Sequence, residues 1–82
     1  MRDILDRQPT TPGKVAFAWQ LAAGPALGRA GTPDWSADGT LRVRARDQAW
    51  LREIRRARPI ITERLRQLLG PDAVRKLVIE EA

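Results

Sequence analysis

Apolar and polar residues alternate through the middle of the chain, and this alternation predicts a strand. Every second residue from 41 to 45 is apolar, and arginines occupy the positions between them. A period of two is typical of a strand with one buried face and one solvated face. The dipeptide Asp38-Gly39 favours a tight two-residue hairpin turn, so we expect a preceding antiparallel strand at residues 34–37. The solvated face then carries a row of guanidinium groups, from Arg42, Arg44 and Arg46.

A longer apolar stripe at helical spacing follows this strand. Asp47 precedes the stripe and offers a side-chain oxygen to the first free backbone N–H groups, which predicts an N-cap. Pro59 lies inside the stripe, and because proline removes a helical hydrogen bond, we expect a break near residues 57 and 58. The pattern predicts two tandem helices with one core-facing stripe, formed by Trp50, Ile54, Ala57, Ile61, Leu65 and Leu68.

The first third of the chain is predicted to be helical. Thr11-Pro12 is typical of a helix start, and residues 12–23 are apolar nearly all round, with Trp19 as a packing anchor. We expect part of this apolar surface to bind a partner. Gly24-Pro25 ends the helix and starts a short second one at residues 25–29, because glycine permits a left-handed cap and proline cannot continue the same helix.

The end of the chain completes the expected fold. Gly70 stands where the residue after a helix belongs, and residues 76–80 have the β-branched content of a last strand. The predicted order is α-α-β-β-α-α-β, an α+β fold with a three-stranded sheet and helices packed on one face. We expect residues 1–10 to form a flexible arm and residues 11–82 to form a single domain.

Composition excludes several classes of site. The chain has 82 residues with no cysteine and no histidine, so we expect no disulfide, no common zinc or copper site and no cofactor. A nucleophile would need a matched base, and the one serine, Ser36, has no obvious partner, so we predict no enzyme activity and no small-molecule substrate. Neither a secretory signal nor a membrane-spanning stretch is expected. These features predict a cytoplasmic protein without membrane contact.

The positive charge points to an acidic partner. The formal net charge is +5 and the isoelectric point is near 11.3, which favours nucleic acid. Guanidinium groups match phosphate, and residues two apart on a strand are spaced ~6.6 Å, close to the repeat of an extended nucleic-acid backbone. Alternatively, exposed arginines only keep a surface soluble. The candidate nucleic-acid-binding residues, expected to form one continuous surface, are Arg42, Arg44, Arg46, Arg52, Arg55, Arg56 and Arg58.

Two further features have a functional and a structural interpretation. Residues 28–31 spell GxxG, the loop by which KH domains clamp a nucleic-acid backbone, but here it would join a helix to a strand. The place between the tandem helices holds a basic segment instead. Trp35 is a stacking candidate if it shares a face with the arginines, whereas Trp19 and Trp50 are expected to be core residues.

The spacing of several motifs resembles the DciA family over residues 13–80. The motifs are Trp19, Gly24-Pro25-Ala26-Leu27, Asp38-Gly39-Thr40-Leu41-Arg42-Val43, Ala49-Trp50, and Leu68 with Gly70. The resemblance implies a KH-like domain without a working GxxG loop. It also implies a bacterial replication protein that binds single-stranded DNA and the DnaB-type replicative helicase, and so helps to load the helicase.

Two other functions stay open on the sequence. One is a KH-like RNA-binding module, which would differ in its response to the 2′-hydroxyl. The other is a protein-interaction domain without nucleic-acid contact, whose charge only confers solubility. The residues do not indicate which surface meets the helicase, nor the oligomeric state.

Overall fold

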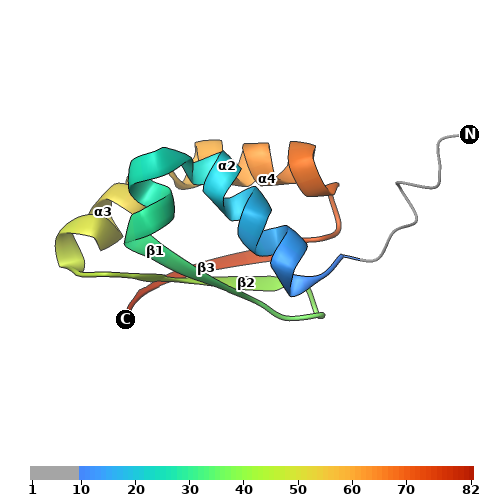
Figure 1. Ribbon diagram of the computed structural model, residues 1–82, viewed down its shortest axis with the longest axis horizontal. Coiled ribbons are helices and arrows are strands. Elements are labelled where there is room, and N and C mark those ends of the chain that lie inside the picture. Colours follow the sequence, from blue (N-terminus) through green and yellow to red (C-terminus); the bar gives the residue numbers. More distant parts are fainter. Residues whose placement is uncertain (1–9) are drawn as a thin grey trace, which may run out of the picture.

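The computed structural model describes residues 10–82, so the arm predicted for residues 1–10 lies, apart from Thr10, outside the described residues. The described part has α+β architecture in the order α-β-β-α-α-β (Figure 1). Its elements are α2 (Pro12–Ala30), β1 (Gly31–Trp35), β2 (Thr40–Ala45), α3 (Gln48–Arg56), α4 (Arg58–Leu69) and β3 (Lys76–Glu81).

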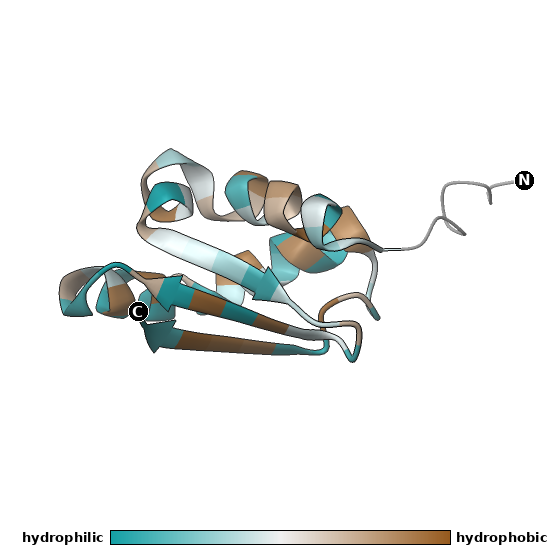
Figure 2. Ribbon diagram, turned by 60° about the horizontal axis from the view of Figure 1, so that its bottom comes forward, coloured by the Kyte–Doolittle hydropathy of each residue, from teal (hydrophilic) through white to brown (hydrophobic). Residues whose placement is uncertain are grey.

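The three strands form a mixed sheet with β2 in the centre. β1 pairs with β2 antiparallel, and β3 pairs with β2 parallel. The helices lie on one face of this sheet and leave the other face open (Figure 1). Leu41, Val43 and Ala45 of β2 are buried under the helices, so the predicted alternation of β2 is confirmed. The hydropathy colouring of Figure 2 shows the same alternation along β2.

The predicted order counted one helix more than the structure has. Residues 12–30 form one element, α2, with a kink at Gly24, whose φ of 88° and ψ of 173° are not helical. The expected interruption at Gly24-Pro25 is therefore present inside a single helical element. After the kink the chain returns beside the first part of α2. There, Trp19 Nε1 donates hydrogen bonds to the carbonyls of Gly31 at 3.2 Å and Gly28 at 3.4 Å.

The first strand and its turn differ from the prediction. The strand begins at Gly31, directly after α2, and ends at Trp35 instead of residue 37. Gly39 N donates to Ser36 O at 2.9 Å, and Ser36 N donates to Thr40 O at 2.9 Å, which closes a three-residue loop. Among the described residues only glycines have positive φ, so Asp38 does not adopt the conformation that a type I′ turn requires.

The predicted caps and helix break are confirmed. The Thr11 hydroxyl accepts a hydrogen bond from Lys14 N, and Asp47 accepts one from Trp50 N. Ala57 separates α3 from α4, and Pro59 lies in the first turn of α4, where its missing N–H costs little. Gly70 follows α4 with a φ of 91°.

One residue of the predicted core stripe lies outside the core. Ile54, Ile61 and Leu65 are buried, and Trp50 and Ala57 pack against the core from partly buried positions. Leu68, in contrast, is 48% exposed, and Leu69 packs against the core instead. The reason is that Leu69, four residues after Leu65, shares the helix face that is turned toward the sheet, and so takes the place in the core that was predicted for Leu68.

Candidate nucleic-acid interface

The first group of arginines lies on the open side of the sheet. Arg42 and Arg44 alternate with the buried residues of β2, so they project away from the helices. The register places Asp34 of β1 opposite Arg42, and Glu80 of β3 beside Arg44. We call this surface the sheet face, made of Thr32, Asp34, Thr40, Arg42, Arg44, Lys76, Val78 and Glu80.

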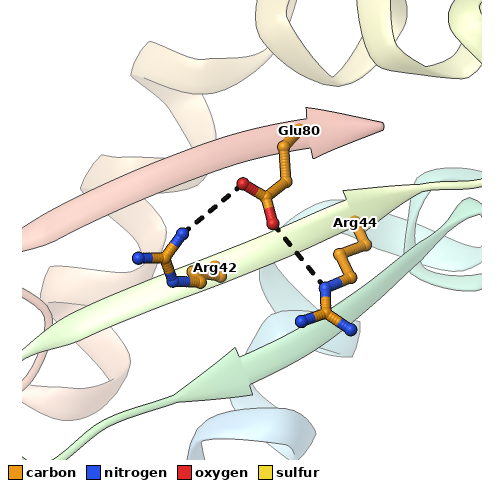
Figure 3. A network of polar contacts seen from close by, with 3 residues as sticks. All are labelled: Arg42, Arg44 and Glu80. Atoms are coloured by element: carbon orange, nitrogen blue, oxygen red, sulfur yellow. Dashed lines mark hydrogen bonds and ion pairs between the residues drawn. The ribbon is translucent and has the colours of Figure 1, made fainter. Parts of the chain in front are cut away.

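A single carboxylate connects the two arginines of the sheet face (Figure 3). Arg42 Nη1 lies 3.5 Å from Glu80 Oε1, and Arg44 Nε lies 3.6 Å from Glu80 Oε2. All three side chains are partly exposed, and exposed ion pairs contribute about 0–1 kcal/mol at most. Glu80 therefore offsets much of the positive charge here, through contacts that an anionic ligand can displace.

The second group of arginines surrounds the junction of α3 and α4. We call Arg52, Arg55, Arg56 and Arg58 the junction cluster; all four are exposed. Arg56 Nη1 lies 3.9 Å from Oε2 of Glu53 in the same helix. Among residues 10–82, no carboxylate oxygen lies within 4.0 Å of a guanidinium nitrogen of Arg52, Arg55 or Arg58, so these three form no ion pair there. Most of the cluster's charge is therefore available to a ligand.

The two groups do not form the one continuous surface that was expected. α3 packs on the helix side of the sheet, because its Ile54 is buried against the core there. The arginines of β2 point to the opposite side. Arg46, which is exposed and directly precedes the N-cap Asp47, lies in the chain between the two groups. Any shared ligand must therefore pass around the α3 end of the sheet.

The GxxG segment has a structural role in this fold. Residues 28–31 span the end of α2 and the start of β1, and both glycines are buried. A Cβ on Gly31 would lie 2.7 Å from Val43 Cγ1 and 3.0 Å from Trp19 Cζ2. Glycine is thus required there for close packing, and the segment is not an open loop for a nucleic-acid backbone.

Trp35 lies on the side of the sheet away from the arginines. It pairs in register with Leu41, and its Nε1 donates a hydrogen bond to Ala73 O at 2.8 Å. Its ring lines a cleft of about 900 Å³ that also includes Lys14 and Arg75. Stacking of a base between Trp35 and the arginine row is therefore excluded by geometry.

Residues 10–82 contain no group of three or more acidic, histidine or cysteine side chains arranged to hold a metal ion. In the same part of the chain, no helix combines the length and the apolar character that crossing a bilayer requires.

Comparison with protein families decides the relationship. A family model described as "Dna[CI] antecedent, DciA" matches residues 3–79, nearly the whole chain. The chain belongs to the DciA family. The resemblance inferred from the sequence motifs is thereby confirmed, over almost the same range. No curated protein gives a significant individual match.

Membership in the DciA family places the chain in DNA replication, as a loader that acts with the DnaB-type helicase, and this is not a known enzyme family. One residue of the candidate site in this DciA protein, Glu80, was not predicted from the sequence. The alternation over residues 76–80 indicates that Glu80 faces away from the core. The parallel register that brings it beside Arg44 is a long-range feature that no local pattern indicates.

Proposed function

We propose that this DciA protein binds single-stranded DNA and the DnaB-type replicative helicase together in the cytoplasm, and so promotes loading of the helicase. The observation that carries the proposal is the junction cluster. Three exposed guanidinium groups that have no acidic partner among residues 10–82 lie within one short segment, Arg52, Arg55 and Arg58. Such groups bind phosphate oxygens and carry no base preference, which suits a loader that acts on any sequence.

The sheet face is the second proposed contact for DNA. Arg42 and Arg44 are about half exposed and carry planar guanidinium groups that match phosphate. Their contacts to Glu80 are weak enough to be exchanged for phosphate contacts. We propose that the strand first meets the junction cluster and then reaches the sheet face past Arg46.

The domain is also proposed to be KH-like. A three-stranded sheet covered on one face by helices supports this assignment. In KH domains the GxxG loop joins two helices of the core unit. Here the corresponding place between α3 and α4 holds Ala57 flanked by the arginines of the junction cluster. In this proposal, side-chain contacts to phosphate replace the backbone contacts of a glycine loop.

Equilibrium binding tests the proposal directly. The full chain is titrated into labelled oligo-dT and oligo-U of equal length, and separately into the replicative helicase of the same organism. We expect salt-dependent binding to oligo-dT, no preference for oligo-U, and a helicase complex that survives nuclease treatment. A strong preference for RNA would favour the RNA-binding function instead. Helicase binding without any oligonucleotide binding at low salt would leave only the protein-interaction function.

Replacing Glu80 by glutamine is expected to strengthen binding to oligo-dT several-fold. The substitution removes the carboxylate that competes with phosphate for Arg42 and Arg44. Fluorescence anisotropy at two salt concentrations measures the affinity and its salt dependence. Glu81→Gln is the matched control, because Glu81 pairs with Ala45 on the other side of the sheet. Equal gains in both variants would mean that only net charge matters and that the sheet face is not a contact.

A further inference from the structure

Four large apolar side chains remain exposed on the helix layer. Phe17 and Leu21 of α2 are 67% and 54% exposed, and Ile60 and Leu68 of α4 are 57% and 48% exposed. Single exposed apolar residues are normal on protein surfaces. Apolar residues that lie together, in contrast, mark interaction sites. The placement of these four side chains therefore decides their meaning.

The two residues of α4 lie along its contact with α2. Arg64 is one helical turn from both Ile60 and Leu68, and residues four apart share a helix face. The Arg64 Nη1 donates a hydrogen bond to the carbonyl of Ala22 in α2 at 3.1 Å. The row of Ile60, Arg64 and Leu68 consequently follows the seam between the helices. A groove of about 370 Å³ runs beside this row, lined by Pro59, Ile60, Glu63, Arg64 and Gln67.

The two residues of α2 lie on the same side of the molecule. Trp19 and Gln20 point to one flank of α2, where both bond to the carbonyl of Gly28. Successive helical residues are about 100° apart, so Leu21 is turned away from that flank. The α4 side is indicated by its neighbour Ala22, whose carbonyl accepts from Arg64, and by Lys14, two turns earlier, which lines one cleft with Leu68. Phe17 is one turn before Leu21 on the same face. The four residues thus border one seam, and we call them the seam strip: Phe17, Leu21, Ile60 and Leu68.

Charge and area select the kind of partner for the seam strip. The helices α2, α3 and α4 together carry eight basic and two acidic residues. Two copies packed through this layer would bring like charges together, which opposes a homodimer. The strip consists of four side chains that are each about half to two-thirds exposed, which suits one docked helix better than a standard interface of ~800 Å² per partner.

We infer that the seam strip docks an amphipathic helix with acidic flanks, supplied by the replicative helicase. This inference rests on the proposed function and adds the helicase-contacting surface to it. The strip lies on the helix layer and the sheet face lies on the opposite side of the sheet (Figure 1). A helicase helix on the strip therefore leaves the sheet face free for DNA, whereas the junction cluster lies next to the strip in the chain, with Arg58 two residues before Ile60.

The experiment compares the full chain with the double variant Phe17→Ser/Leu21→Ser in binding to the helicase and to oligo-dT. We expect helicase binding to weaken at least tenfold, since central apolar anchors dominate interfaces, with oligo-dT binding unchanged. Ile60→Ser on α4 should weaken helicase binding in the same direction. Ala37→Ser/Ala49→Ser, at exposed positions outside the strip, is the control and should bind the helicase like the wild type.

Each result supports or overturns a defined statement. Circular dichroism first establishes that the variants are folded, as expected for substitutions at exposed sites. Equal helicase binding by wild type and both strip variants would overturn the inference and leave the proposed function intact. No helicase binding by the wild type would overturn the proposed function itself. A wild-type dimer in sedimentation that the double variant dissociates would assign the strip to a second copy of this chain, and would also overturn the inference.

Discussion

Replacing Trp19 by alanine is expected to cost about 3–5 kcal/mol of unfolding free energy, the usual range for a buried aromatic residue. Trp19 is fully buried, and its Nε1 donates to the carbonyls of Gly28 and Gly31. The substitution leaves a cavity and two carbonyls without this donor. The total unfolding free energy of a small domain is roughly 0.05–0.15 kcal/mol per residue, so a large part of its stability would be lost. Urea denaturation followed by circular dichroism measures the effect.

A matched aromatic control is available on the same helix. Phe17 lies two residues before Trp19 and is largely exposed. Phe17→Ala is therefore expected to change the unfolding free energy by no more than about 0.5 kcal/mol. Similar losses in Trp19→Ala and Phe17→Ala would contradict the described orientation of α2 on the sheet.

Neutralising the junction cluster is expected to weaken oligo-dT binding on the order of 100-fold near 0.1 M salt. The triple variant Arg52→Gln/Arg55→Gln/Arg58→Gln removes three exposed guanidinium groups that have no acidic partner in the described part of the chain. Each phosphate contact on a single strand contributes about 0.7 to the slope of log K against log salt. The slope should therefore fall by about 2. Anisotropy titrations at salt concentrations from about 50 to about 200 mM measure both the affinity and the slope.

The control for this variant carries the same change in net charge elsewhere. Arg29, Arg66 and Arg75 are exposed and lie outside both arginine groups. Their triple replacement by glutamine should reduce affinity only a few-fold through the general field of the protein. If both triple variants lose affinity and slope equally, binding depends on net charge alone and the junction cluster is not the site.

Local chemistry predicted most of the elements. Thr11, Asp47 and Pro59 act through hydrogen bonds within a few residues of themselves, and the helix starts and the break between α3 and α4 follow from them. The alternation along β2 likewise predicted which face is solvated. The boundary predicted at Gly24 is present as a kink with non-helical backbone angles, and the two helical parts predicted on either side of it together make up α2.

Features that depend on distant residues were not predictable. The start of β1 at Gly31 depends on close packing against Val43 and Trp19, which no local pattern indicates. The separation of the two arginine groups has a similar origin. Period-two alternation sends the arginines of β2 away from the core, whereas burial of Ile54 holds α3 on the core side. The sequence shows both patterns but not their relative orientation.

The parallel pairing of β3 with the central strand has a consequence for biosynthesis. The β1–β2 hairpin joins neighbouring residues and is ready to form as soon as it leaves the ribosome, whereas Leu41 meets its partner Leu77 only after both intervening helices have been synthesised. Leu77 and Ile79 cover part of the buried surface of β2. Until they emerge from the exit tunnel, the nascent chain exposes apolar surface that chaperones recognise, so cotranslational folding of this domain is completed late.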